Sequence, residues 1–359
     1  MNDPQFIFTC CQPGAESALK AEFSRNHPDL NFAFSRPGFV TFKNNGKRLP
    51  SGFDLKSVFA RTYGESIGRS ESLASAVEIA KESLGERTIE RLHVWPRTLK
   101  DEANPLEGFA SQFQNELTLA AEELGVPEKK SLPNLKAKKG ENVLDLIRVD
   151  DDVWWIGWHQ ANSAVTRDPG GICRLEPNDK MVSRAYLKML ESLNWSQLPV
   201  TAGDHCVEIG SAPGGSCQAL LEKGLIVTGI DPSKMDESLL AHPRFTHIRK
   251  RGADVRRSEY GNFRWLMIDT NVAPNHTLDT LEHIVNNRRV HIQGMIITLK
   301  LTNWKMANNI PEYLERVRSW GYRYVRARQL AHNHQEFCVA ALRNRSQTRF
   351  RMQRKNQSA

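Results

Sequence analysis

The second half of the chain alternates short, uninterrupted apolar segments with segments that have helical spacing. Apolar runs of this kind are typical of parallel strands buried on both faces, with helices covering the two sides of the sheet. The last two strands are joined by a loop too short for a parallel crossover, so we expect them to be antiparallel. The expected strands are residues 205–209, 226–230, 245–248, 265–268, 294–299, 322–326 and 337–342, with helices over 180–193 and 215–223.

The first half of the chain predicts a second α/β arrangement. It begins in the order strand, helix, strand, strand, and it ends in a hairpin whose turn is Asp150-Asp-Asp152. The segment Asp168-Pro-Gly-Gly171 then breaks the pattern and starts a linker. The expected strands are residues 6–11, 32–34, 38–42, 92–95, 143–149 and 153–158, and the expected helices are 15–24, 72–84 and 107–123.

These patterns predict an α/β protein in several parts. A chain of 359 residues is long enough for two or three domains. We expect an N-terminal region over 1–60, a second α/β region over 61–168, a domain with a largely parallel sheet over 169–345, and a basic tail over 346–359.

The basic tail carries much of the charge of the chain. The net charge is 49 − 41 = +8, and the residues between Arg343 and Ala359 include six bases and no acid. A second basic cluster lies within residues 128–139. Because Lys and Arg release counterions when they bind phosphates, both segments favour RNA or DNA as the partner. A solvated C-terminus is the alternative interpretation of the tail.

The composition excludes several classes of protein. A hydrophobic fraction of 40% and a charged fraction of 25% are ordinary for a soluble globular protein. The sequence contains no run of about 18 apolar residues, so we expect no membrane span, and its start lacks the pattern of a signal peptide. The six cysteines form no CxxC pair, which predicts free thiols in a reducing cytoplasm and no structural metal.

The strongest motif is the glycine-rich segment Val207-Glu-Ile-Gly-Ser-Ala-Pro-Gly-Gly-Ser216. It lies where a strand ends and a helix begins, and its glycines let the backbone approach a ligand closely. The spacing fits neither the G-x-G-x-x-G pattern of dinucleotide enzymes nor the phosphate-binding loop of nucleotide hydrolases. The alternative is a strand-turn-helix that needs glycines only for its own backbone.

Two acids extend this site. Asp231 ends the next strand, 21 residues after Gly210, where a carboxylate can bind the hydroxyls of a ribose. Asp254 follows the third strand, where it can contact an adenine amino group, although a solvated loop acid is the alternative. A ribose-binding acid beside a glycine-rich turn, without a phosphate signature, predicts a nucleoside ligand without phosphates. S-adenosylmethionine fits this description.

These motifs resemble those of the FtsJ/RrmJ-type ribose 2′-O-methyltransferases, and most closely those of the RlmM family, which modifies large-subunit ribosomal RNA. Besides the glycine-rich loop, that family has a Lys-Asp-Lys-Glu tetrad. The residues that match the tetrad are, in chain order, Lys188, Asp269, Lys300 and Glu336. The segment that follows the aspartate, Thr-Asn-Val-Ala-Pro, departs from the family's pattern and can alter contacts with the substrate.

The resemblance implies a Rossmann-like methyltransferase sheet in residues 169–345, with S-adenosylmethionine as the cofactor. It also implies a THUMP-like RNA-binding region over 61–168 with a ferredoxin-like lead over 1–60. The implied reaction is 2′-O-methylation of a cytidine ribose in 23S ribosomal RNA before the subunit is assembled. The implied cofactor-binding residues are Glu208, Gly210, Ser211, Ala212, Pro213, Gly214, Gly215, Ser216, Asp231, Asp254 and Asp269.

The tetrad suits the chemistry of this reaction. A ribose 2′-hydroxyl is a poor nucleophile, so the site must orient the hydroxyl and remove its proton. A lysine acts as a base only if its pKa falls, which a neighbouring positive charge and partial burial achieve. The resemblance and this charge argument give Lys300 the role of the base, Asp269 the role of anchoring both lysines, and Glu336 the role of holding Lys188.

Other functions fit the sequence less well or stay open beside this one. Base N-methylation favours an Asn/Asp-Pro-Pro-Tyr/Phe motif after the fourth strand, which is absent, and methylation at cytosine C5 needs a nucleophilic cysteine there. Two alternatives stay open: 2′-O-methylation of another RNA, such as a transfer RNA or a cap, and a non-catalytic RNA-binding assembly factor. In the first half, two sets of residues are either RNA contacts or ordinary core and linker residues. They are Trp154, Trp155 and Trp158, and the pair Arg167 and Arg174.

Overall fold

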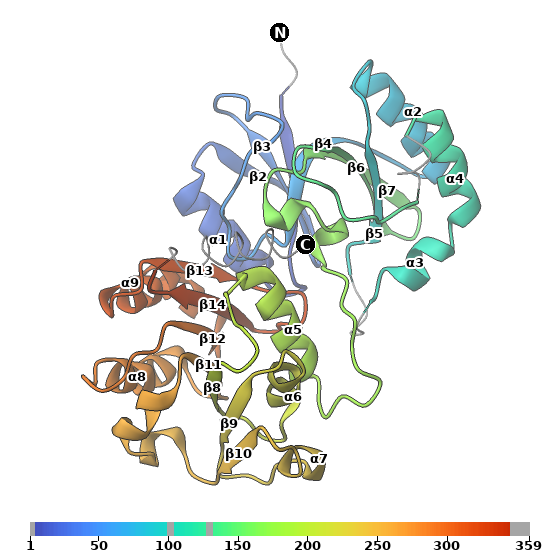
Figure 1. Ribbon diagram of the computed structural model, residues 1–359. Helices are drawn as coiled ribbons and strands as arrows, with labels where there is room; N and C mark the ends of the chain where they lie inside the picture. Colours follow the sequence, from blue (N-terminus) through green and yellow to red (C-terminus); the bar gives the residue numbers. More distant parts are fainter. Residues whose placement is uncertain (1–3, 99–103, 127–131, 345–359) are drawn as a thin grey trace. The chain divides into compact units, whose positions relative to one another are not determined.

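A computed structural model of the chain describes residues 4–98, 104–126 and 132–344 (Figure 1). The chain folds into two compact units, Met1–Arg174 and Leu175–Ala359. Each unit contains one seven-stranded sheet. The predicted basic tail, and residues 128–131 of the second basic cluster, lie outside the described residues. Within the described ranges, no helix has the length and apolar character needed to cross a membrane.

The sheet of the first unit has the strand order β2-β3-β1-β4-β7-β6-β5. All neighbours are antiparallel except β5 and β6, which run in parallel. The sheet continues across the boundary expected at residue 60, and that finer division stays a prediction, as does the THUMP-like character of the region. The strands are β1 (Phe6–Cys10), β2 (Leu30–Arg36), β3 (Phe39–Asn44), β4 (Thr62–Ser70), β5 (Arg91–Pro96), β6 (Asn142–Asp150) and β7 (Val153–Gln160).

Strand β4 was not predicted from the sequence, and its two glycines explain why. A glycine inside a strand normally weakens it, so the segment around Gly64 and Gly68 carries a poor strand pattern. In the structure, a Cβ at Gly64 would lie 2.7 Å from the ring of Phe8 and 2.8 Å from the carbonyl oxygen of Trp158. The missing side chain therefore lets the Phe8 ring pack directly on the sheet.

Helices of the first unit cover part of this sheet. Helices α2 and α4 lie side by side on the strands β4, β6 and β7 (Figure 1), and their apolar residues share one core with Trp154 and Trp158. These two indoles are therefore core side chains. The helices are α1 (Glu16–Asn26), α2 (Leu73–Leu84), α3 (Glu107–Ser111) and α4 (Gln114–Glu123), with short 3₁₀ turns η2 (Ala164–Thr166) and η3 (Pro169–Gly171).

The single helix expected over 107–123 is wrong, because the structure has α3 and α4 with a break between them. Phe113 lies at the break, with φ −118° and ψ 22°. Its ring packs edge-on against Trp154, with the ring centroids 5.1 Å apart. Packing against a buried indole thus outweighs the continuous helical spacing of the sequence.

The sheet of the second unit has the order β10-β9-β8-β11-β12-β14-β13. Strands β8 to β12 are parallel to one another, and β14 is antiparallel to both of its neighbours. This is the expected Rossmann-like methyltransferase sheet with an antiparallel last strand. Its strands are β8 (His205–Ile209), β9 (Ile226–Ile230), β10 (Phe245–Ile248), β11 (Trp265–Asp269), β12 (Gly294–Lys300), β13 (Tyr324–Arg328) and β14 (Glu336–Leu342).

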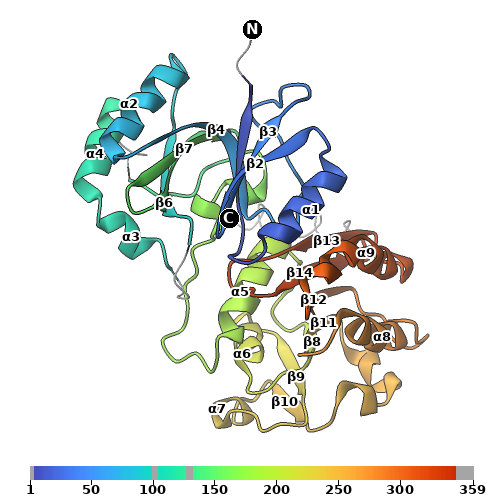
Figure 2. The same cartoon turned by 180° about the vertical axis from the view of Figure 1, so that it is seen from behind.

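Helices lie on both faces of this sheet, as the uninterrupted apolar strands predict. Both views show α5 and α6 on one face and α8 and α9 on the other (Figures 1 and 2). The helices are α5 (Ala185–Ser196), α6 (Gly215–Glu222), α7 (Glu237–Leu240), α8 (Pro274–Val285) and α9 (Ile310–Ser319). The short 3₁₀ turns are η4 (Gly252–Asp254), η5 (Arg257–Asn262) and η6 (Trp304–Asn309).

Helix α5 begins later than the expected start at residue 180. The backbone N–H of Lys180 donates to the side chain of Asn178, and that of Val182 donates to the side chain of Gln218. These side-chain acceptors hold the segment in turns, so regular helix starts only at Ala185.

Candidate active site

The strand order of the second unit reverses between β8 and β11, since β9 and β10 continue from β8 in one direction and β12 continues from β11 in the other. In open α/β sheets, ligands bind at such a reversal, beyond the carboxyl ends of the strands. Gly210 directly follows β8, Asp231 directly follows β9, and Asp269 and Lys300 are the last residues of β11 and β12. The parallel strands therefore bring the glycine-rich loop and half of the predicted tetrad to one edge of the sheet.

The antiparallel strand β14 brings the predicted glutamate to the same edge. Glu336 is its first residue, and it lies directly opposite Lys300 in the register of β12 and β14. Opposite residues of an antiparallel pair project on the same face. The Nζ of Lys300 donates to Oε2 of Glu336 and lies 3.0 Å from Oδ1 of Asp269.

Lys188 completes the group from helix α5. Its Nζ lies 2.7 Å from Oδ2 of Asp269 and 2.7 Å from Oε1 of Glu336. Each lysine thus contacts both acids and each acid contacts both lysines, in a closed ring of two positive and two negative charges. The side chain of Glu336 is 5% exposed and the other three are 18–21% exposed, so the ring is largely but not fully shielded from water.

The charges of the ring sustain one another. Burial opposes the charge of Lys188, but the carboxylates of Asp269 and Glu336 outweigh burial and raise the pKa of the Lys188 ammonium. Burial likewise opposes ionisation of Asp269, yet Lys188 and Lys300 lower the pKa of its carboxyl. Lys188 is therefore a firmly charged cation that shares both carboxylates with Lys300. The role of Lys300 as the base stays a prediction.

Three residues that the sequence analysis did not single out hold the loop before β14. The buried carboxylate of Glu191, on α5, accepts the backbone N–H groups of Ala331 and His332, at 2.8 and 2.9 Å. Gln329 donates to the backbone oxygen of His334. No local sequence pattern signals these contacts, because each acceptor lies on another element or across a loop.

The third of these residues, Asn333, touches the ring itself. Its side-chain oxygen accepts the N–H of Leu330, and its Nδ2 donates to Oε1 of Glu336 at 3.1 Å. That oxygen is the one that also contacts Lys188. Asn333 therefore fixes the orientation of the Glu336 carboxylate, and so positions the two lysines.

The glycine-rich loop passes close to the ring. Gly210 has φ +79°, and a Cβ there would lie 2.4 Å from the backbone oxygen of Asp269. Only glycine permits this contact between the ends of β8 and β11. The bond between Ala212 and Pro213 is cis. The hydroxyls of the two loop serines turn inward, Ser211 towards Met235 and Ser216 towards the backbone of α5.

The carboxylate of Asp231 has acceptor positions available for the hydroxyls of the expected ribose. Its carboxylate accepts the backbone N–H of Ala212 at 3.2 Å and that of Ser233 at 2.8 Å. Since a carboxylate has about four acceptor positions, two are available for hydroxyls of a ligand. The loop, this carboxylate and the neighbouring ring thus fit a nucleoside with a short charged arm. Asp254 lies exposed in η4 after β10, and its contact with an adenine stays a prediction.

Glu208 lies beneath the loop. Its carboxyl is 1% exposed and accepts the thiol of Cys217 at 2.9 Å. Burial raises the pKa of Glu208 to about 8. The carboxyl thus supports the loop from inside the unit. Its expected role in binding the cofactor stays a prediction.

The expected RNA contacts of the first unit have protein partners. Arg167 donates to the backbone oxygen of Ala137, and Arg174 lies 3.1 Å from Glu107 in an exposed ion pair. Trp155 donates to Ser66. In the described parts of both units, no group of three or more His, Cys, Asp or Glu side chains is arranged to hold a metal ion.

Comparisons with known proteins agree with this geometry. Residues 181–308, which include the glycine-rich loop and three of the four ring residues, match the FtsJ-like methyltransferase family. Several curated relatives carry the name ribosomal RNA large subunit methyltransferase M. The protein from Tolumonas auensis is 26% identical over 95% of this chain and 97% of its own. The protein from Pseudoalteromonas translucida is 24% identical over 92% and 94%. The protein from Halorhodospira halophila is 32% identical over about half of each chain.

The resemblance noted from the sequence is confirmed by these matches. The relatives from Tolumonas and Pseudoalteromonas align with both units, so the similarity is not confined to the second. The chain is accordingly a methyltransferase that uses S-adenosylmethionine.

We predict that Gly210→Ala weakens S-adenosylmethionine binding strongly, whereas Gly203→Ala does not. Both glycines have positive φ, +79° and +83°, but only a Cβ at Gly210 meets another atom within 4 Å. Each variant loses about 1–2 kcal/mol from backbone strain, and only Gly210→Ala also displaces the loop from β11. Calorimetric titration with the cofactor, beside thermal melts, checks this; equal cofactor affinities in the two variants would contradict it.

The buried Glu208 predicts a pH-dependent stability. The pKa of Glu208 in the folded chain, about 8, lies above the ordinary value of about 4.3. Its contribution to the free energy of unfolding is therefore present at low pH and is lost as the pH rises through about 8. We expect the free energy of unfolding to fall less between pH 5 and pH 8.5 in Glu208→Gln than in the native chain. Urea unfolding at several pH values measures this. The control Glu312→Gln, an exposed position on α9, should follow the native curve, and a Glu208→Gln curve that also does so would refute the burial argument.

Proposed function

We propose that this chain, whose second unit contains an FtsJ-like methyltransferase domain, transfers the methyl group of S-adenosylmethionine to the 2′-hydroxyl of a ribose in large-subunit ribosomal RNA. The observation that carries the proposal is the closed ring of Lys188, Asp269, Lys300 and Glu336 at the strand-order reversal. The relatives named as large-subunit methyltransferases support the substrate.

The cofactor-binding residues of this proposal are those of the loop and its surroundings. The loop after β8 lines one side, Asp231 receives the ribose hydroxyls, and Asp254 receives the adenine. When bound, S-adenosylmethionine supplies an electrophilic methyl group on a positively charged sulfur. The backbone of the loop can approach this ligand closely because Gly210 carries no side chain.

The ring residues move and hold one proton. Lys300, in its neutral form, would accept the proton that the 2′-hydroxyl loses when its oxygen takes up the methyl group. Lys188 stays charged, because both carboxylates raise the pKa of its ammonium. Asp269 and Glu336, which contact both lysines, then hold the newly formed Lys300 ammonium. Asn333 keeps Glu336 in place throughout.

The finer parts of the proposal concern the substrate and the first unit. The modified nucleoside is a cytidine of 23S RNA, methylated before the subunit is assembled in the cytoplasm. The first unit binds that RNA, with a ferredoxin-like lead over 1–60 and a THUMP-like region over 61–168.

We predict that Lys300→Met lowers the rate of methyl transfer by at least about 100-fold, because a general base commonly contributes that much. Binding of S-adenosylmethionine should change little, since the loop and Asp231 are untouched. The measurement is single-turnover transfer from labelled cofactor to unmodified large-subunit RNA, with cofactor affinity determined in parallel.

The matched control is Lys305→Met, an exposed lysine five positions later, outside the ring. It removes the same charge and should retain the native rate. A Lys300→Met enzyme that transfers methyl groups at a near-native rate would exclude this base. A native chain that binds the cofactor but methylates no RNA would instead favour the non-catalytic assembly factor, and label on transfer RNA alone would replace the substrate.

A further inference from the structure

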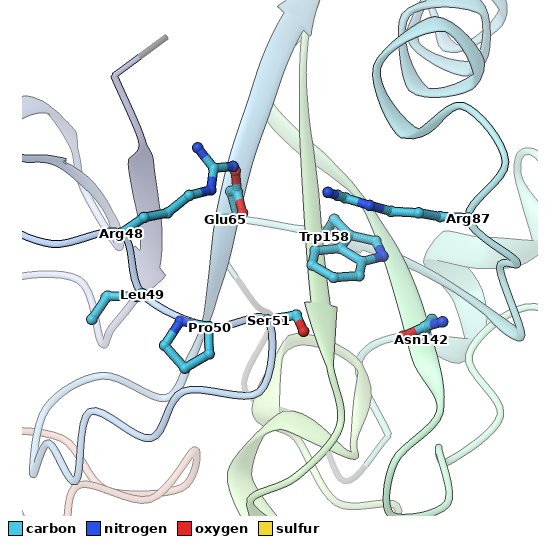
Figure 3. A pocket seen from close by; sticks show the side chains of 8 residues that line it. All are labelled: Arg48, Leu49, Pro50, Ser51, Glu65, Arg87, Asn142 and Trp158. Atoms are coloured by element: carbon cyan, nitrogen blue, oxygen red, sulfur yellow. The ribbon is translucent and has the colours of Figure 1, made fainter. Parts of the chain in front are cut away.

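The first unit contains a pocket that the proposed chemistry does not use. It has a volume of about 470 Å³ and is lined by residues of β4, β6 and β7 and of two loops. The register pairs Glu65 of β4 with Trp158 of β7, so their side chains lie on one face of the sheet. Arg48 and Arg87 approach from loops on opposite sides, and their guanidinium groups point toward one another across the pocket (Figure 3).

The wall of the pocket includes a largely buried indole. Trp158 is 6% exposed, and its indole N–H has no hydrogen-bond partner in the structure. A buried donor without a partner costs about 1–3 kcal/mol. The nitrogen itself is fully buried, so the part of Trp158 that lines the pocket is its ring and not its N–H.

The charges of the pocket define the ligand further. Arg48 forms an ion pair with Glu65, which also accepts the amide of Gln5 at 3.3 Å. Arg87 lies over the Trp158 ring, 4.7 Å from its centroid. The two arginines and one glutamate of the lining leave one net positive charge, which matches a single phosphodiester.

The remaining lining groups favour a nucleotide over an acidic peptide. Ser51 and Asn142 present a hydroxyl and an amide toward each other below the indole (Figure 3), where sugar hydroxyls can find partners. Arg87 is exposed, and the ring of Trp158 supports it from one side. Unpaired bases of RNA stack on arginine planes held in this way.

We propose that this pocket binds one nucleotide of single-stranded RNA. Arg87 and Arg48 hold its phosphodiester, and the base stacks on Arg87. The identification of the nucleic acid as RNA rests on the proposed function of the chain. The pocket belongs wholly to the first unit, so it serves to hold the substrate and takes no part in methyl transfer.

The test compares two arginine variants of the full chain. Arg87→Gln removes a pocket charge, and Arg69→Gln removes the same charge from an exposed position on β4 that does not line the pocket. With a fluorescently labelled single-stranded RNA as the probe, Arg87→Gln should bind about fivefold to tenfold more weakly at low salt. It should also reduce the slope of log affinity against log salt by about 0.7, the value for one phosphate of a single strand.

Equal affinities in the native chain and the Arg87→Gln chain would overturn the proposal, as would equal losses in both variants. Polyglutamate, used as a second probe, should bind equally to the native and Arg87→Gln chains; an equal loss for this probe and for RNA would identify a general acidic-polymer site and overturn the nucleotide assignment. Thermal melts should be unchanged, because Arg87 is exposed.

Steady-state kinetics distinguish a failure of this proposal from a failure of the proposed function. Arg87→Gln should raise the KM for RNA and leave kcat unchanged, whereas loss of a ring residue lowers kcat. If the native chain transferred no methyl group to any RNA, the proposed function would fail. The comparison of RNA binding by the two arginine variants would still decide whether the pocket holds a nucleotide.

Discussion

The second unit depends on four mutually compensating charges at one edge of its sheet. Lys188, Asp269, Lys300 and Glu336 come from a helix and three strands, and each ion contacts two of opposite sign. Removing one partner from a buried ion pair costs about 3–5 kcal/mol, because the other charge is left uncompensated. The closed ring avoids this cost and so keeps two ammonium groups side by side.

The positions of the ring residues follow from the sheet. Three of them lie at strand ends, where parallel strands and the antiparallel β14 share one edge. The four residues were identified through the resemblance to the methyltransferase family. The strand ends that bring three of them together are visible in the sequence as the limits of apolar runs. Glu191 and Asn333 were missed for the opposite reason. Their partners are a loop backbone and a carboxylate, and no periodic pattern signals such contacts.

The fold was predictable to a similar degree. The alternation of apolar runs and helical segments predicted the strands of the second unit, with β13 displaced by two residues from 322–326. The failures in the first unit have local physical causes. Gly64 weakens the strand pattern of β4 in the sequence, and its missing side chain leaves room for the ring of Phe8. The ring of Phe113 packs on Trp154 where a continuous helix was expected. In both places a tertiary contact of an aromatic ring outweighs the local propensity of the backbone.

The chemical position of the transferred methyl group shows directly whether the ring directs methylation to a ribose oxygen. Unmodified large-subunit RNA would be incubated with labelled S-adenosylmethionine and then hydrolysed with alkali. A 2′-O-methyl group removes the hydroxyl that alkaline cleavage needs, so we expect the label in one alkali-resistant dinucleotide. Label recovered in single nucleotides, with the methyl group on a base, would contradict it.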